Sequence, residues 1–108
     1  MTKEAWLILI SDGVNKGLVK VIDSDKLGKD YGTRGIVCNI GDNAFYFYDY
    51  ADNYDDEDGL ERFKKDFSQE EINEQIVNQL IAMQEEREEE DEFDPEYAYY
   101  YYFLVENL

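Results

Sequence analysis

The chain has 108 residues, a formal net charge of −17 and 16% aromatic residues. This length predicts a single domain over residues 1–108, and the 44% hydrophobic content excludes a disordered acidic tail. The absence of histidine and the presence of one cysteine exclude a histidine-based catalytic site, the usual zinc ligand sets and an intramolecular disulfide.

The first half of the chain predicts a series of strands. A continuous apolar run at residues 5–10 predicts a buried strand, and the glycine-containing loop after it predicts a hairpin to a second strand at 18–22. Further strands are predicted at 35–40 and, from the alternation of tyrosine and phenylalanine, at 44–50. Cys38 lies inside the third of these strands, so we expect a buried and unreactive thiol.

The second half predicts helices followed by one more strand. Residues 60–67 predict a short helix. Ser68 and Glu71 form a capping box, and apolar residues repeating every 3.6 positions predict a long amphipathic helix over 69–92. An aromatic run at 97–105 predicts a last strand. The expected fold is therefore α+β, an antiparallel sheet of about five strands with one long amphipathic helix packed on one face, in the order ββββ(α)αβ.

The negative charge is concentrated in one part of the chain. Residues 1–41 carry six basic and five acidic side chains, a balance of +1, whereas residues 42–108 carry four basic and twenty-two acidic ones, a balance of −18. Two segments hold much of this charge, an acidic loop (residues 52–58) and an acidic helix end (residues 85–94). Such a surface indicates a positively charged protein partner, because it repels nucleic acid and anionic membranes.

The acidic helix end has a charge density close to that of a DNA duplex. Seven of the eight residues 85–92 are acidic and Arg87 is the exception, which gives a formal charge of −6. Eight helical residues extend about 12 Å, a length over which a duplex carries about seven phosphate charges. Carboxylates at a helix C-terminus also oppose the helix dipole, at a few tenths of a kcal/mol each. Solvated helix faces often carry such runs, but this placement favours a function.

The acidic loop resembles a calcium-binding loop in composition alone. With Gly59 at the sixth position of an EF-hand loop, Tyr54 and Lys65 occupy the first and twelfth positions, where Asp and Glu are needed. The sequence also lacks a phosphate-binding glycine loop and a nucleophile motif. It therefore predicts a non-enzymatic protein with no catalytic residue, no cofactor and no dedicated metal site.

Small, strongly acidic, tyrosine-rich single domains resemble the phage-encoded DNA mimics that block restriction enzymes or CRISPR effectors. The resemblance rests on composition and charge placement in the second half of the chain. It implies an inhibitor that occupies the cationic nucleic-acid-binding groove of a host defence nuclease, with carboxylates in place of phosphates. The predicted partner-binding residues are Asp52, Asp55, Asp56, Glu57, Asp58, Glu85, Glu86, Glu88, Glu89, Glu90, Asp91, Glu92, Asp94, Tyr99 and Tyr101.

Other interpretations use the same features. An immunity protein that neutralises a basic toxin would rely on the same electrostatics, and an acidic regulatory or calcium-buffering domain would use the same carboxylates. A domain whose surface is incidentally acidic is the plainest alternative. The apolar run at 5–10 is too short for a signal peptide core or a membrane span, so we expect a cytoplasmic protein, in the host cell if phage-encoded.

Overall fold

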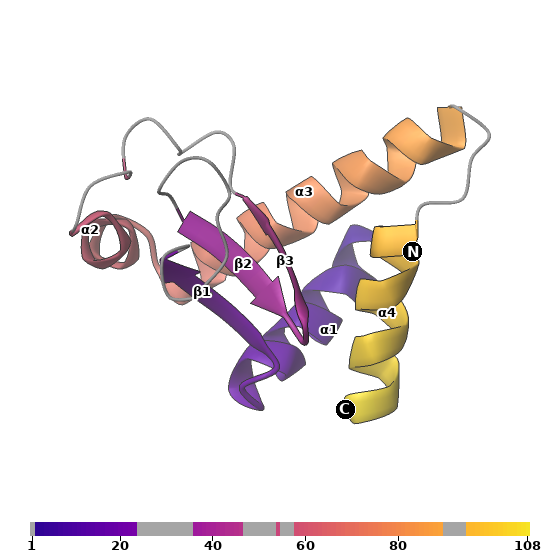
Figure 1. Cartoon of the computed structure of the whole chain (residues 1–108), viewed down its shortest axis with the longest axis horizontal. Coiled ribbons are helices and arrows are strands. Elements are labelled where there is room, and N and C mark those ends of the chain that lie inside the picture. The colour runs from indigo at the N-terminus through magenta and orange to yellow at the C-terminus, as the bar shows by residue number, and fades with distance from the viewer. Residues whose placement is uncertain (1, 24–35, 47–53, 55–57, 90–94) are drawn as a thin grey trace.

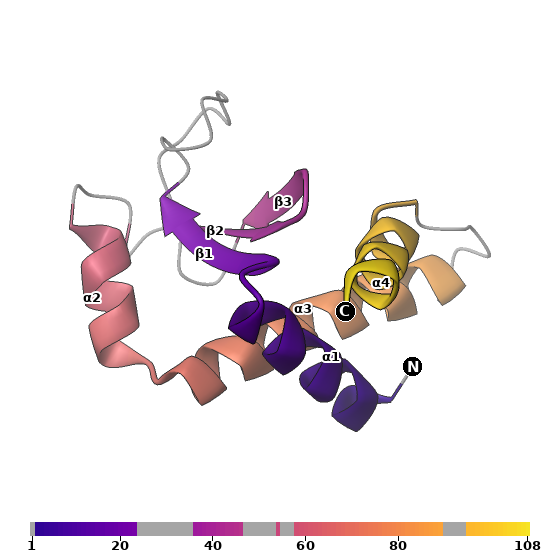
Figure 2. The same cartoon turned by 90° about the horizontal axis from the view of Figure 1, so that it is seen from below.

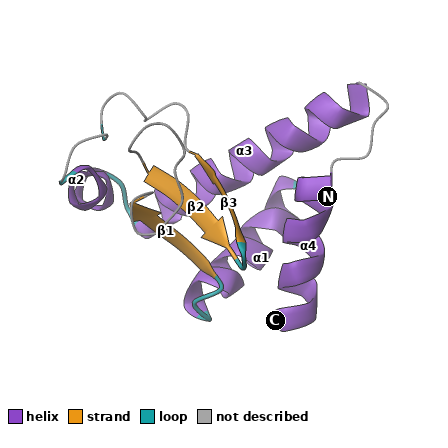
Figure 3. Cartoon of the chain, viewed as in Figure 1, coloured by secondary structure: helices purple, strands orange, loops and turns teal. Residues whose placement is uncertain are grey.

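A computed structural model describes residues 2–23, 36–46, 54, 58–89 and 95–108 of the chain (Figure 1). Within these residues the structure is α+β, as expected, but the prediction of about five strands and one long helix is wrong. The described residues form three strands and four helices (Figure 3). In chain order the elements are α1 (Lys3–Asn15), β1 (Val19–Asp23), β2 (Ile36–Ile40), β3 (Asn43–Tyr46), α2 (Gly59–Asp66), α3 (Gln69–Glu89) and α4 (Pro95–Asn107).

The predicted first strand at 5–10 is part of helix α1, so the predicted first hairpin is wrong as well. The Thr2 hydroxyl oxygen caps the helix by accepting a hydrogen bond from a first-turn N–H at 3.1 Å. Gly17 follows the helix with a φ of +76°, and the Leu18 N–H donates to the Gly13 carbonyl oxygen at 2.8 Å. This is the Schellman arrangement, so the glycine-containing segment ends a helix instead of turning a hairpin.

Burial explains why these apolar residues are helical. Trp6, Ile10 and Gly13 are buried, which is helical spacing, whereas Ile8 is 66% exposed. A strand would have placed Trp6, Ile8 and Ile10 on one face. Gly13 lets α1 approach the sheet closely, since a Cβ atom added there would lie 2.7 Å from Val19 Cγ2. A short apolar run fits a strand or a buried helix, and its sequence alone does not separate the two.

The predicted last strand at 97–105 is also wrong, because these residues belong to helix α4. The helix begins at Pro95, whose fixed φ suits the first helical position. Tyr100 and Leu104, four residues apart, are both fully buried. The β-propensity of tyrosine is a weak preference that burial at helical spacing overrides here.

The three strands form one antiparallel sheet in the order β1-β2-β3. In its register Cys38 of β2 is opposite Val21 of β1 and Phe45 of β3. A two-residue turn joins β2 to β3, and its Gly41 has a φ of +61°. Over the residues that it describes, the structure thus confirms three predicted strands: 18–22, the 36–40 part of 35–40 and the 44–46 part of 44–50.

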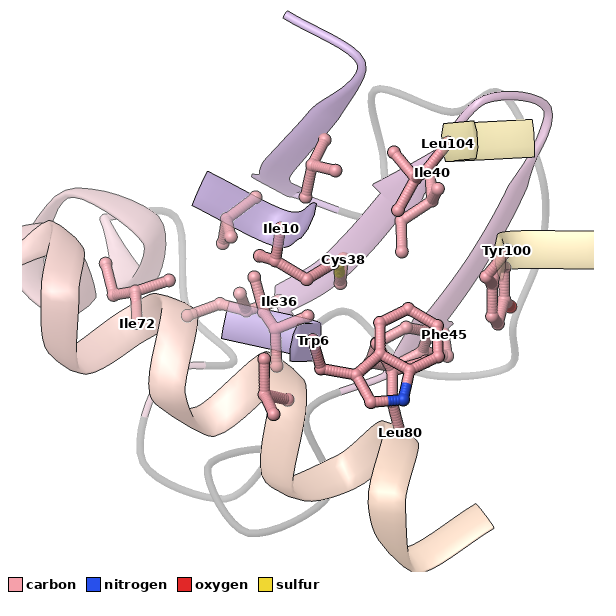
Figure 4. Packing of buried hydrophobic residues seen from close by; sticks show 14 of the residues in the cluster. Trp6, Ile10, Ile36, Cys38, Ile40, Phe45, Ile72, Leu80, Tyr100 and Leu104 are labelled. Carbon is pink, nitrogen blue, oxygen red and sulfur yellow. The ribbon is translucent and has the colours of Figure 1, made fainter. Parts of the chain in front are cut away.

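Helices α1 and α3 cover one side of the sheet, and α4 lies beside them (Figure 2). Alternate residues of β2 point into this core, where Trp6 of α1, Leu80 of α3 and Tyr100 of α4 meet them (Figure 4). Cys38 is fully buried there, and desolvation raises the pKa of its thiol. The thiol therefore stays protonated, as the prediction of an unreactive cysteine requires.

Helix α3 starts at the predicted capping box. The Glu71 N–H donates to Ser68 Oγ at 3.2 Å, and the Ser68 N–H donates to Glu71 Oε1 at 3.1 Å. The predicted short helix at 60–67 is confirmed as α2, and the predicted helix at 69–92 is confirmed as α3 through residue 89. Residues 90–92 lie outside the described part of the chain.

Replacing Ser68 with alanine is expected to lower the free energy of unfolding by about 1 kcal/mol. The reason is that Ser68 Oγ accepts a hydrogen bond from the Glu71 N–H, which otherwise has no partner within the first turn of the helix. Urea denaturation measures this change. Ser68→Thr keeps a capping oxygen and should recover most of the loss. Equal stability of Ser68→Ala and the native chain would show that the cap contributes nothing.

Candidate partner-binding surface

The structure describes seven of the predicted partner-binding residues. They are Asp58, Glu85, Glu86, Glu88, Glu89, Tyr99 and Tyr101. The remaining eight lie outside the described residues: Asp52, Asp55, Asp56, Glu57, Glu90, Asp91, Glu92 and Asp94. The acidic loop is therefore represented by its last residue, and the acidic helix end by its first five.

Asp58 stands at the N-cap position of α2, beside cations of the same helix. Its carboxylate lies 3.5 Å from Arg62 Nε, and the Arg62 guanidinium lies over the Tyr54 ring at 5.4 Å from its centroid. Lys64 and Lys65 follow in the last turn and are exposed. The charge of Asp58 is thus partly balanced within α2, which makes it a weaker candidate for a cationic partner than its position in the acidic loop suggests.

Two carboxylates in the first turns of α3, Glu71 and Glu74, are engaged within the chain. Glu71 belongs to the capping box, and Glu74 Oε1 accepts a hydrogen bond from Lys3 Nζ at 3.1 Å. At the other end of the helix Glu85 is exposed, and the backbone stays helical through Glu89. Arg87 is the one cation within this stretch of sequence. Glu85 therefore begins a run of carboxylates in the sequence at the end of the helix where the helix dipole disfavours them.

Tyr99 contributes to the fold as well as to the surface. Its side chain is half-buried, and its ring stacks on Phe103 with centroids 5.8 Å apart. Its hydroxyl oxygen accepts a hydrogen bond from the Asp42 N–H at 3.0 Å, which ties α4 to the β2–β3 turn. The strand prediction placed Tyr99 and Tyr101 on one face, but in the helix they point to different neighbours.

Tyr101 lies against α1, and its neighbour Tyr102 faces solvent. The Tyr101 and Trp6 rings meet edge to face with centroids 6.2 Å apart, so Tyr101 is half-buried. Tyr102 is 59% exposed, more than any other tyrosine for which the structure describes burial. Sequence reasoning missed Tyr102 because it treated the tyrosines as a strand. A helical wheel with Tyr100 and Leu104 facing the core would have identified it.

Asp58 and the acidic end of α3 do not lie together. Asp58 opens α2 at one end of the molecule, whereas the acidic end of α3 lies at the other, beside the start of α4 (Figures 1 and 2). The Cα atoms extend 37 Å along this longest axis. The cations of α2 and the acidic end of α3 therefore lie at different ends of the molecule.

Two further properties concern the described residues. Among them, no group of three or more acidic or cysteine side chains is arranged to hold a metal ion. None of the helices, over their described residues, combines the length and the apolar character needed to cross a bilayer.

Comparisons of the chain with protein-family models, with curated proteins and with solved structures find no match. The candidate surface therefore rests on its own geometry, and the acidic helix end is its strongest part.

Proposed function

We propose that the protein is a non-enzymatic inhibitor that acts as a DNA mimic. Its acidic helix end enters the cationic nucleic-acid-binding groove of a host defence nuclease, either a CRISPR effector or a restriction enzyme. The observation that supports this most is the end of α3, where the sequence is rich in carboxylates, Glu85 is exposed, and the helix lies away from α2 and its cations. An anionic rod of this kind suits a groove that normally binds a phosphate backbone.

The mechanism is electrostatic. Carboxylates of the acidic helix end pair with arginine and lysine side chains that otherwise bind phosphates. A net charge of −17 steers the protein toward a cationic groove and speeds association, and added salt weakens both effects. Tyrosines of α4 supply rigid contact area next to the carboxylates. No chemical step is needed, because occupancy of the groove excludes the nucleic acid. The proposed site of action is the cytoplasm of the host cell.

The experiment is an inhibition panel. Purified guide-loaded CRISPR effectors and restriction endonucleases are each assayed for cleavage of a duplex DNA substrate, with and without a stoichiometric amount of the protein. We expect at least one nuclease to lose cleavage in proportion to the protein added. A panel in which every enzyme keeps full activity, while a basic nuclease toxin is neutralised, would favour the immunity-protein alternative and overturn the proposal.

A further inference from the structure

One polar side chain lies inside the apolar contact between α1 and α3. Among the residues whose burial the structure describes, Asp23 and Asn73 are the buried polar ones, each 7% exposed. Asn73 belongs to α3, where its neighbours around the helix, Ile72, Ile76 and Val77, are buried apolar residues. An apolar side chain at this position would continue the buried stripe of the helix, so the presence of an amide here needs a physical reason.

The amide of Asn73 is hydrogen bonded at both of its polar atoms. Its Nδ2 donates to Ser11 Oγ of α1 at 3.4 Å, and its Oδ1 accepts from Gln69 Nε2, one turn earlier in α3, at 2.8 Å. Burial of an amide is costly unless such partners are present. The bond to Gln69 stays within one helix, whereas the bond to Ser11 joins two. The bond to Ser11 therefore depends on how α3 is placed against α1.

A second polar contact between the same helices shows how they cross. Lys3 Nζ of α1 lies 3.1 Å from the carboxylate of Glu74, the residue after Asn73. Lys3 and Ser11 lie about 12 Å apart along α1, whereas their partners are adjacent on α3. Helix α1 therefore crosses α3 near these residues, as the two ribbons do in Figure 2. The Lys3–Glu74 pair is exposed and contributes little to stability, so the buried amide is the stronger constraint on the crossing.

The apolar part of this contact does not fix the position of α3 by itself. Trp6 and Ile10 of α1 belong to the same core cluster as the buried stripe of α3. The burial of apolar area is non-directional, so it does not favour one alignment of two apolar surfaces over another. The stripe continues along α3 to Leu80. A shift of α3 by one turn, about 5.4 Å, would therefore still present apolar side chains to α1.

The amide makes such shifted positions unfavourable. If Asn73 moved to the present place of Val77, which is fully buried, its amide would be buried away from Ser11. If α3 moved the other way, Val77 would face the Ser11 hydroxyl, and the hydrogen bond between the helices would be lost. A single buried polar residue can fix the alignment of packed helices in this way, at some cost in stability.

We propose that Asn73 is a positioning residue that selects one placement of α3 across α1. The effect extends along the whole helix, because α3 also carries the acidic helix end. A shift of one turn at the crossing would displace that end by about 5.4 Å. The role of Asn73 concerns the fold, so it is independent of the proposed function.

The test is Asn73→Leu, which keeps the branched shape of the side chain and removes its polar atoms. In urea denaturation followed by circular dichroism, we expect a midpoint equal to or above that of the native chain. In two-dimensional NMR spectra of the backbone amides, we expect the signals of α1 and α3 to become broadened or doubled, where the native chain gives one set. The control Ile76→Leu conserves volume on the same face of α3 and should keep one set of signals.

Ser11→Ala tests the pairing between the helices. It leaves Asn73 Nδ2 without its partner in α1, so the urea midpoint should fall. Adding Asn73→Leu to Ser11→Ala removes the unpaired donor and should restore the midpoint. A double variant that is no more stable than Ser11→Ala would overturn the pairing on which the proposal depends.

One sharp set of signals from a folded Asn73→Leu chain would overturn the proposal, because α3 would then keep its placement without the amide. If Asn73→Leu does not fold, Asn73→Ala decides by the same criterion, since a smaller side chain does not overfill the site. A single set of signals from Asn73→Ala would likewise overturn the proposal, and broadened or doubled signals would support it.

Discussion

Replacing Trp6 with alanine is expected to lower the free energy of unfolding by about 3–5 kcal/mol, because the cavity left by a fully buried indole is only partly refilled. The side chain is enclosed by the core cluster and contacts the ring of Tyr101. Urea denaturation followed by circular dichroism measures the change. A loss this large from one substitution can approach the whole stability of a small domain.

Ile8→Ala is the matched control, because its effect on stability distinguishes the observed helix from the predicted strand. In a strand Trp6 and Ile8 would share a face, and both substitutions would be costly. In helix α1 Ile8 is 66% exposed, so its loss should change the free energy of unfolding by about 0.5 kcal/mol or less. Comparable large losses for Trp6→Ala and Ile8→Ala would contradict the helical assignment of α1.

Neutralising the acidic helix end is expected to weaken binding to the inhibited nuclease at least about tenfold, which is about 1.4 kcal/mol. In this variant Glu88, Glu89, Glu90 and Asp91 are each replaced with glutamine. Association should slow, and the dependence of binding on salt should become shallower. The fold should be unharmed or slightly stabilised, since each removed charge relieves repulsion and opposition to the helix dipole. Stopped-flow binding kinetics and urea denaturation measure the two effects.

A charge-matched control separates local pairing from the net charge. It removes four exposed carboxylates of α2 and the start of α3 by amide substitution at Glu61, Asp66, Glu70 and Glu74. The net charge changes by the same amount, but on α2 and the first turns of α3 instead of at the acidic end of α3. We expect a modest slowing of association and no change in dissociation. Equal effects of the two variants would mean that the acidic helix end is not the contact surface.

The sequence predicts the elements whose signals are local. The capping box of Ser68 and Glu71 determines the start of α3 through two reciprocal hydrogen bonds, and both are present. The strands that became β1 and β2 are bounded by glycine and polar residues, and they are correctly placed. These signals need no knowledge of the tertiary structure, which is why they are reliable here.

The two wrong strands depend on tertiary contacts. Residues 5–10 and 97–105 are apolar or aromatic almost throughout, so their periodicity does not show which side chains face the core. In the fold α1 and α4 pack against each other, and Trp6 and Tyr101 meet between them. Each helix also packs on other parts of the core, α1 on α3 and α4 on Phe45 of β3, and no single window of sequence contains these contacts.

The candidate surface was predictable in part. Charge placement identifies the acidic helix end, because opposition to the helix dipole can be recognised from sequence. It does not show that Asp58 is paired with Arg62, or that α2 lies at the far end from the carboxylates of α3. The exposure of Tyr102 follows from the helix that the strand prediction missed.

The central claim is that the protein and the nucleic acid compete for one groove. The decisive measurement is the apparent inhibition constant for a nuclease of the panel at increasing concentrations of its duplex substrate, at about 0.1 M and at about 1 M salt, where the Debye length falls from about 10 Å to about 3 Å. We predict that the apparent constant rises linearly with DNA concentration and that inhibition is much weaker at the higher salt. An inhibition constant independent of DNA, or one unchanged by salt, would contradict the claim.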